Sequence, residues 1–166
     1  MRKSIAAGFA VAALAGVMVA APASAASNDG LTVLTFNKKT WNAINAEMMV
    51  KPGGKTMVIN VRSFGFPSKA LDQDTIVGKG SLSLVRADAS WKMRKPVLDL
   101  ANASMAATVA GMGPDYELFD LAGLKQGKRT VKAKVNLAMG QAAMLNQALK
   151  TDIFKDGMAI GKVVYE

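Results

Sequence analysis

The feature that most restricts the fold of this chain is a two-residue alternation of apolar and polar side chains, which is clearest at residues 129–139. The apolar set there is Val131, Ala133, Val135 and Leu137, and the polar set is Thr130, Lys132, Lys134 and Asn136. Successive side chains of a β-strand point to opposite sides, so this pattern predicts a strand with one buried and one solvated face. Such strands are typical of antiparallel sheets.

Similar segments recur along the chain and predict a β-rich domain. Strands are predicted at residues 31–36, 56–66, 81–86, 91–95, 97–100, 104–110, 116–121 and 158–165, with a turn at 51–55 and a loop at 68–79. Pro67 is expected to end the second strand. Helical spacing predicts helices at residues 40–50, with Thr40 as N-cap, and at residues 141–150. The predicted fold is mainly β: a single antiparallel β-sandwich or barrel-like domain with one or two short helices.

The N-terminal residues 1–25 have the pattern of a secretory signal peptide. Two basic residues, an apolar run at residues 5–21 and the small residues Ala23-Ser24-Ala25 follow one another. An uncleaved membrane anchor is the alternative, but the run is shorter than the roughly 20 residues that a bilayer requires. We expect cleavage after Ala25, which leaves residues 26–166 as one β-rich domain without a transmembrane anchor. That domain is expected to be secreted or to lie in the periplasm or cell envelope.

The chain contains neither cysteine nor histidine, and this excludes several classes of site. Cys/His zinc sites, Ser-His-Asp triads, Cys-His dyads, iron–sulfur clusters and disulfides all require one or the other. No Ser-x-x-Lys spacing is present to activate a serine. Two carboxylates brought together by folding could still hydrolyse glycosides, although the 12 acidic residues show no such pair in the sequence. We therefore expect a protein that is not an enzyme.

Two short motifs resemble ligand-binding loops but lack required positions. Asp72 and Asp74 form a D-x-D pair, yet an EF-hand loop needs glycine and glutamate where this chain has Val77 and Ser83. A solvated turn is the favoured interpretation and a loose calcium site the alternative. The glycines of Gly78-Lys-Gly80 resemble the start of a dinucleotide-binding loop, but Ser83 replaces the third glycine and a strand follows. No metal site is expected.

The chain has 11 methionines, and their thioethers are suitable ligands for Cu(I). Met48 and Met49 are adjacent, whereas Met57, Met93 and Met139 are expected at core-facing strand positions. Methionine fills irregular gaps in protein cores, so packing is the favoured interpretation.

Basic residues outnumber acidic ones by 21 to 12, giving a formal net charge of +9. The candidate residues for an anionic partner are Lys92, Arg94, Lys128, Lys132 and Lys134. A solvated face that discourages edge pairing is the simpler interpretation. The alternative is attraction to an anionic envelope polymer, lipid headgroups or an acidic partner, which salt weakens. Nucleic acid is not expected, because the chain is predicted to be exported and no aromatic platform interleaves these cations.

Several motifs resemble those of HtaA-like domains, which occur in secreted bacterial haem-transport proteins. The similar segments are Phe64-Gly-Phe66-Pro67, Gly78–Leu84, Lys95–Leu100, Ala142–Leu149, Phe154–Gly157 and Ile160-Gly161. The resemblance covers most of residues 56–164. It implies an exported, β-rich domain with a small helical element, in agreement with the alternating pattern.

The resemblance also implies haem binding through a tyrosine near the start of the domain, supported by histidine. The corresponding opening of this chain contains Phe36 and Trp41 but no tyrosine, and Tyr116 and Tyr165 match no ligand motif of the family. Haem would have to be ligated by tyrosine or methionine without histidine. No cofactor is therefore expected, with haem as the open alternative.

These observations predict a secreted, non-catalytic binding module of the envelope or the extracellular space, with an unknown ligand. One alternative is binding of haem or another hydrophobic ligand by an HtaA-like domain. Another is a self-assembling surface subunit, suggested by the apolar segment 97–110. The sequence leaves the oligomeric state open.

The first testable prediction concerns processing of the N-terminus. The intact mass of the exported protein should correspond to a chain that begins at Ala26, because cleavage follows the A-x-A-like stretch. An exported chain that retains residues 1–25 would contradict the assignment.

Overall fold

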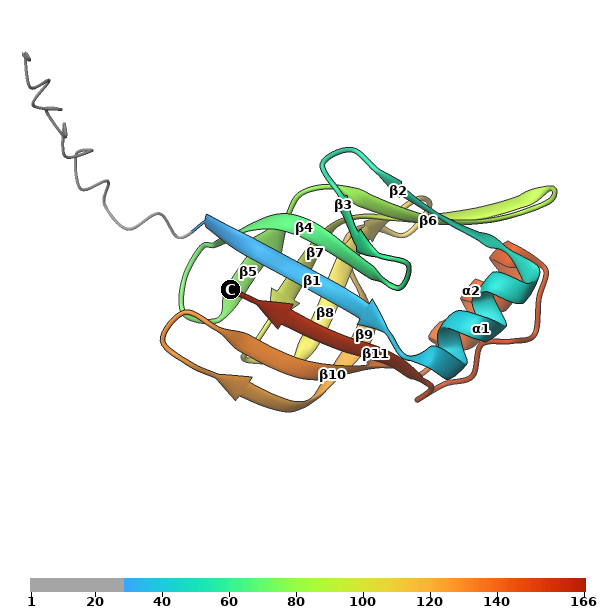
Figure 1. Ribbon diagram of the computed structural model, residues 1–166. Coiled ribbons are helices and arrows are strands. Elements are labelled where there is room, and N and C mark those ends of the chain that lie inside the picture. Colours follow the sequence, from blue (N-terminus) through green and yellow to red (C-terminus); the bar gives the residue numbers. More distant parts are fainter. Residues whose placement is uncertain (1–28) are drawn as a thin grey trace, which may run out of the picture.

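Eight antiparallel strands close into a barrel in the computed structural model, which describes residues 29–166 (Figure 1). In order around the ring, the strands are β7 (Ala89–Asp99), β5 (Thr75–Gly78), β4 (Ser63–Ala70), β1 (Asp29–Phe36), β11 (Ala159–Tyr165), β10 (Val131–Leu137), β9 (Gly113–Gln126) and β8 (Ser104–Val109). Pairing between β8 and β7 completes the ring. The expected signal peptide, residues 1–25, lies outside the described residues.

Three further strands and two helices are added to the barrel. They are α1 (Lys38–Glu47), β2 (Met49–Gly53), β3 (Met57–Asn60), β6 (Ser81–Arg86) and α2 (Gln141–Leu149). Strand β6 pairs with β7, β2 pairs with β6, and β3 pairs with β4. Among residues 29–166, no helix is long and apolar enough to cross a membrane. The prediction of a mainly β, antiparallel domain with short helices is confirmed in its barrel form.

The alternation in the sequence corresponds to the two faces of the barrel wall. On β10, the apolar residues at odd positions are buried, whereas Lys132 and Lys134 between them are exposed. On β11, Val163 and Tyr165 are buried, whereas Val164 between them is half-buried and Lys162 before them is exposed. Each of these strands therefore contributes one face to the interior and one to solvent, as the period of two predicts.

The barrel is filled by side chains and does not enclose a large cavity. Leu34, Phe66, Leu118, Val135 and Val163 are all at most 1% exposed. Where the barrel meets the helices, an apolar void of about 30 Å³ is left, which is far smaller than the roughly 300 Å³ or more of a small-molecule pocket. The packed interior therefore favours binding of larger ligands on the outer surface.

Strand β7 belongs both to the barrel and to the added sheet. Residues 89–94 pair with β6, and residues 97–99 pair with β5. Between these stretches Lys95 has a φ of 48°, Pro96 has no N–H, and the register with β8 shifts. The expectation of two separate strands here is wrong, because the chain bends at this point without ending the strand.

The sequence predicted one strand over residues 56–66, and this prediction is wrong. A turn after Asn60 divides it into β3 and β4, which pair with each other. Pro67 lies inside β4 and does not end it. Pro67 stands opposite Leu31 of β1. The backbone N–H and carbonyl of Leu31 both bond to Glu166, which lies on the other side of β1 from Pro67. β1 therefore does not require the N–H that proline lacks.

Two segments expected to be irregular contain strand residues. The expected turn at 51–55 includes the end of β2, and the expected loop at 68–79 includes the end of β4 and all of β5. Pro52 lies in β2, which is an edge strand. Proline is tolerated at an edge because no neighbour requires its N–H.

The N-cap of α1 differs from the predicted Thr40, and α2, for which the sequence predicted no N-cap, is capped by a distant carboxylate. At α1, Oδ1 of Asn37 accepts the backbone N–H of Thr40 at 2.8 Å, so Asn37 is the N-cap. At α2, Gly140 has no side chain, and Oδ1 of Asp156 accepts the N–H of Ala142 at 3.0 Å. Hydrogen bonds from the backbone N–H groups of Ala142 and Gly140 lower the pKa of the Asp156 carboxyl, and Ala142 has the larger effect.

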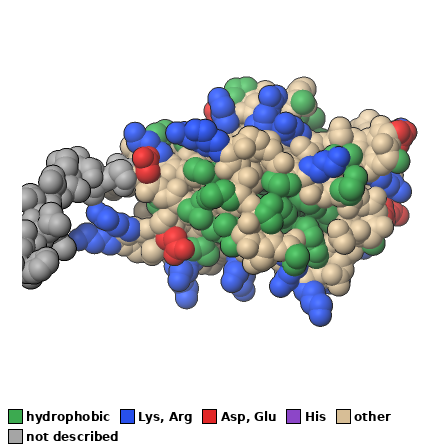
Figure 2. All heavy atoms as spheres, turned by 45° about the horizontal axis from the view of Figure 1, so that its top comes forward, with side chains coloured by type: hydrophobic (Ala, Val, Ile, Leu, Met, Phe, Trp, Pro, Cys, Tyr) green, Lys and Arg blue, Asp and Glu red, His purple; other side chains and the backbone are tan. Residues whose placement is uncertain are grey.

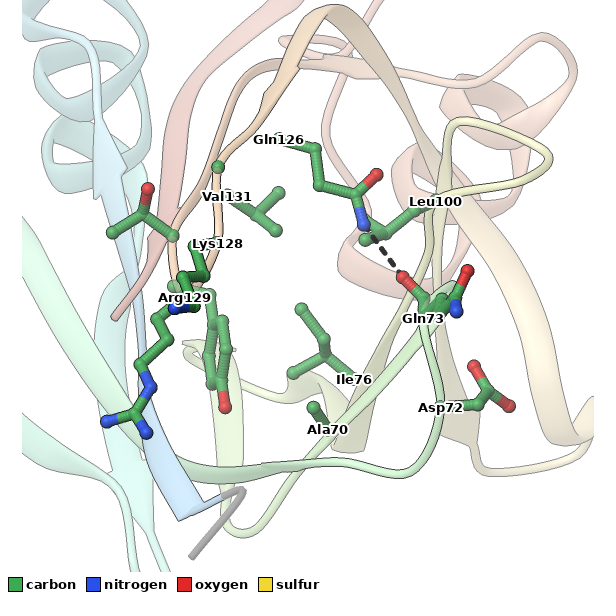
Figure 3. A pocket seen from close by; sticks show the side chains of 12 residues that line it. Ala70, Asp72, Gln73, Ile76, Leu100, Gln126, Lys128, Arg129 and Val131 are labelled. Atoms are coloured by element: carbon green, nitrogen blue, oxygen red, sulfur yellow. Dashed lines mark hydrogen bonds between the residues drawn. The ribbon is translucent and has the colours of Figure 1, made fainter. Parts of the chain in front are cut away.

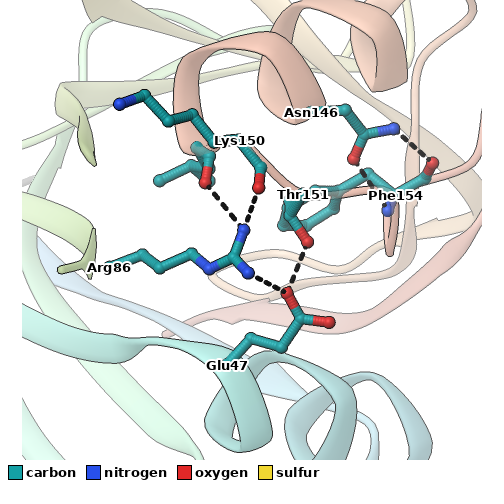
Figure 4. A network of polar contacts seen from close by, with 7 residues as sticks. Glu47, Arg86, Asn146, Lys150, Thr151 and Phe154 are labelled. Atoms are coloured by element: carbon teal, nitrogen blue, oxygen red, sulfur yellow. Dashed lines mark hydrogen bonds and ion pairs between the residues drawn. The ribbon is translucent and has the colours of Figure 1, made fainter. Parts of the chain in front are cut away.

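A polar network around Arg86 joins the C-terminal ends of the two helices (Figure 4). Nη1 of Arg86 donates to the carbonyl oxygen of Leu149 at 3.4 Å and also to that of Lys150. Nη2 of Arg86 lies 3.6 Å from Oε2 of Glu47. Oγ1 of Thr151 donates to the same glutamate oxygen at 2.7 Å. One guanidinium therefore connects α1, β6 and α2.

Substitution of Asp156 tests the cap of α2. Asp156→Ala should lower the melting temperature at neutral pH, because the first turn of α2 loses its acceptor. The pKa is lowered in the folded state, so the stabilisation is complete above the unfolded pKa of about 3.9 and is lost as the pH falls through the folded-state pKa. Thermal unfolding followed by circular dichroism should show variant and parent converging in acid. A difference that is the same at every pH would contradict this account, and Asp156→Asn, which keeps an acceptor, is the control.

Substitution of Arg86 tests the network between the helices. Arg86→Ala should lower the free energy of unfolding by about 1–2 kcal/mol, because the last carbonyls of α2 and Glu47 lose their donor. Arg86→Lys should recover part of this, since an ammonium cannot span the same acceptors as a planar guanidinium. Urea denaturation measures both effects, with the exposed Lys92→Ala as control. Unchanged stability of Arg86→Ala would show that the network contributes nothing.

Candidate functional site

Three aromatic rings meet where β1 leads into α1, and we call Phe36, Trp41 and Phe64 the aromatic cluster. The ring centroids of Phe36 lie 5.8 Å from Trp41 and 6.1 Å from Phe64, and those of Trp41 and Phe64 are 6.1 Å apart. These tilted and edge-on contacts are favoured geometries for aromatic pairs. Phe36 and Phe64 are buried, whereas Trp41 is half-buried. The cluster is therefore open to an external apolar ligand through Trp41.

Strand β3 lies beside this cluster and exposes apolar side chains on both of its faces. Val58 is 61% exposed and stands opposite Phe64 in the β3–β4 pairing, so it projects on the same side as Phe64. Met57 and Ile59 project to the other side and are 44% and 49% exposed. Val61, in the turn after β3, is 74% exposed. Contiguous exposure of large apolar side chains marks an interaction surface.

Cations lie on two segments that adjoin the aromatic cluster, the turn after β3 and the first turn of α1. Nη1 of Arg62 donates to the carbonyl oxygen of Phe36 at 3.3 Å, which places the guanidinium next to the cluster. Lys38 and Lys39 are exposed in the first turn of α1, which contains no acidic residue. Lysines at this end add to the partial positive charge of the helix N-terminus. Figure 2 shows a face on which hydrophobic side chains gather in the middle and Lys and Arg side chains stand around them.

Neither tyrosine lies at the aromatic cluster. Tyr116 is on β9, opposite Ala107 of β8, and Tyr165 is buried at the end of β11. The chain contains no histidine. Within residues 29–166, no group of three or more Asp or Glu side chains is arranged to hold a metal ion. The cluster and its cations can therefore hold a flat apolar molecule with anionic groups, but they offer no phenolate or imidazole.

A second candidate is a hollow of about 460 Å³ at the opposite end of the barrel from the helices (Figure 3). Loops at residues 70–76 and 126–131 form its walls, and Nε2 of Gln126 joins them by donating to the carbonyl oxygen of Gln73 at 2.8 Å. Asp72 and Arg129 both line it, so its charges are mixed. This hollow is suited to a small polar ligand and not to a large apolar one.

The five cations predicted to meet an anionic partner do not form one surface. Lys132 and Lys134 lie on the outer face of β10, and Lys128 lies in the hairpin that precedes it. Lys92 and Arg94 lie on β7, and strands β8 and β9 stand between β7 and β10. All five side chains are exposed.

The other motifs noted in the sequence have local structural roles. Oδ1 of Asp72 accepts the N–H of Asp74 at 2.9 Å, which closes a turn and lowers the pKa of the Asp72 carboxyl. A Cβ on Gly78 would lie 2.9 Å from Cγ of Pro96, so close packing of β5 against β7 explains this glycine. Neither motif points to a bound ligand.

The expectation that methionines fill the core holds for some positions and is wrong for others. Met93 is 1% exposed, as predicted. Met57 and Met139 are 44% and 76% exposed. Met57 is on a strand that pairs along one edge, and Met139 follows the end of β10, so neither position is covered by a second layer.

Sequence reasoning did not identify Val58, Val61 and Arg62 as parts of a site. The expectation of one strand over residues 56–66 assigned alternate residues to a core. The sequence does contain a signal, because Met57 to Ile59 are three consecutive apolar residues that a half-buried strand cannot all bury.

The apolar segment 97–110, which suggested self-assembly, faces largely inward. Its large buried side chains are Leu98, Leu100, Met105 and Val109, each at most 6% exposed. These residues fill the barrel, so the segment does not supply an apolar surface for assembly.

No protein-family model matches this chain, and neither does any curated protein sequence. Three solved structures from Corynebacterium glutamicum are similar to it. The haem-binding protein HtaB has a TM-score of 0.62 at 8% identity, over 82% of this chain and 91% of HtaB. The C-terminal domain of HtaA has a TM-score of 0.61 at 13% identity, over 84% of this chain and 95% of that domain. The N-terminal domain of HtaA has a TM-score of 0.57 at 15% identity, over 83% and 97%.

This likeness confirms the resemblance noted in the sequence at the level of the fold. The matches extend over nearly the whole of each HtaA or HtaB chain, so they include the barrel as a unit. This chain has the fold of the HtaA and HtaB domains.

Proposed function

We propose that this chain is an exported, non-catalytic domain that binds haem or another flat apolar ligand carrying carboxylates. The observation that supports this most directly is the exposed strand β3 beside the aromatic cluster and Arg62. The same fold occurs in HtaB, which is a haem-binding protein. The packed interior of the barrel supports a surface site, since its void of about 30 Å³ is too small for such a ligand.

The binding energy comes mainly from apolar contact. A flat ligand that covers Val58 and the open side of Trp41 removes apolar surface from water on both molecules. If about 200 Å² of apolar surface is covered, the gain is about 5 kcal/mol before the entropy of association is subtracted. Aromatic stacking on Trp41 adds to this.

Orientation comes from the cations next to the aromatic cluster. The Arg62 guanidinium is held beside Phe36 and can pair with a carboxylate through two parallel hydrogen bonds. Lys38 and Lys39 stand at the N-terminal end of α1 and attract the same anionic groups. A ligand with one apolar plane and carboxylates at its edge satisfies both requirements.

Recognition in this site does not require iron. The tyrosine and histidine that the sequence resemblance implies are absent, and Tyr116 and Tyr165 lie elsewhere in the barrel. The residues present fit the macrocycle and its carboxylates. Metal-free protoporphyrin should therefore bind about as tightly as haem.

A titration followed by absorbance and by Trp fluorescence tests the proposal. Haem and metal-free protoporphyrin should each bind saturably at one equivalent. Val58→Asp should weaken both by tenfold or more, because a charge at this exposed position opposes an apolar plane and repels carboxylates. Arg62→Gln should weaken the dicarboxylate porphyrin more than its diester.

Met139→Asp is the matched control, since Met139 is also exposed but lies after β10, away from β3. Its affinity should equal that of the parent. Absence of saturable binding would reject the proposed function. Binding that survives Val58→Asp and is lost in Arg129→Glu would place the ligand in the 460 Å³ hollow instead.

A further inference from the structure

The outer wall of the barrel carries two adjoining rows of residues fixed by strand register. One row crosses four neighbouring strands and consists of Gly65 of β4, Val33 of β1, Val164 of β11 and Lys132 of β10. Lys125 of β9 follows opposite Lys132. Because directly opposite residues of paired strands point to the same face, this row changes from apolar to basic across the wall.

Lys132 and Lys125 form the basic end of this row, and Lys162 and Lys134 stand opposite each other in the adjoining row. We call Lys125, Lys132, Lys134 and Lys162 the lysine face. All four are exposed. In the described chain the ion pairs join Arg86 to Glu47 and Lys150 to Asp88, so none of them neutralises these lysines.

This arrangement is unfavourable for the isolated domain. Like charges placed directly opposite each other destabilise a sheet. Two acidic residues lie in the neighbouring rows, Asp120 opposite Asn136 and Glu166 opposite Leu31, and they leave an excess of positive charge beside the four lysines. The repulsion is relieved when an anionic surface lies against the lysines.

An apolar stripe borders the lysine face, and it consists of Leu31, Val33, Ile59 and Val164. The Cδ1 atoms of Leu31 and Ile59 each lie 3.1 Å from the position of a Cβ on Gly65, so they meet above this glycine. Leu31, Val33 and Val164 are half-buried although they face outward, and Ile59 is 49% exposed. A side chain at position 65 would separate them.

We propose that the lysine face and the apolar stripe together form a docking surface for an anionic lipid bilayer. The headgroup phosphates would meet the lysines, and the branched side chains would lie at the boundary of the acyl region. A soluble polyanion would use the lysines and leave the stripe uncovered. A second copy of the chain placed on this face would bring lysines against lysines. This inference is independent of the proposed function.

Vesicle co-sedimentation of the full chain after removal of residues 1–25 tests this surface. Binding to vesicles of phosphatidylglycerol and phosphatidylcholine should be saturable, should fall with added salt, and should be absent with phosphatidylcholine alone. Each lysine near an anionic surface strengthens binding about fivefold, so Lys132→Glu/Lys134→Glu should weaken it by about 25-fold or more.

Lys92→Glu/Arg94→Glu is the matched control, because it changes the net charge equally on another face of the barrel. It should weaken binding by less than about threefold. Equal losses in the two double variants would overturn the proposal, since net charge alone would then explain binding. Thermal unfolding of each variant distinguishes loss of binding from loss of folding.

The apolar stripe is tested by Met57→Gln/Ile59→Gln, which alters Ile59 of the stripe and the exposed Met57 on the same outward side of β3. This variant should also weaken vesicle binding. If it binds like the parent and soluble polyphosphate competes with vesicles at equal phosphate concentration, the surface recognises polyanions and the bilayer assignment is wrong.

Discussion

The pairing of β7 with three other strands is the constraint on which the rest of this structure depends. Its first part carries β6 and, through β6, β2, while its last part pairs with β5 on one edge and β8 on the other. Closure through β8 fixes which residues of every strand face inward. The bend at Lys95 and Pro96 allows one strand to serve both the ring and the added sheet.

The strands that could be predicted from the sequence are those with one face packed in the core and the other face exposed to water. In β10, Lys132 and Lys134 separate buried apolar residues, and this contrast is visible in the sequence. β2 and β5 are short and their sequences show no such contrast, although alternate residues of β5 are buried, and β3 exposes both of its faces. Pro52 and Pro67 also suggested irregular chain, although the neighbouring strands do not require their N–H groups.

Less of the candidate site could be predicted, because its residues meet through long-range register. The sequence showed that Phe36 and Trp41 occupy the opening of the domain, and the structure adds Phe64 to them. It also showed that Lys132 and Lys134 share a face. It could not show that Lys162 stands opposite Lys134, since strand order decides this. For the same reason, Lys92 and Arg94 were assigned to a surface from which two strands separate them.

Strand β3 connects the two surfaces, and its geometry explains how it stays exposed without causing aggregation. An apolar strand with a free edge is normally a template for pairing with other chains. β3 has four residues, and its register with β4 shifts between Val58 and Asn60. A short, bulged strand offers a poor ladder to a second chain. Its side chains can therefore face outward, with Val58 directed to the aromatic cluster and Ile59 to the apolar stripe, while its backbone edge resists self-association.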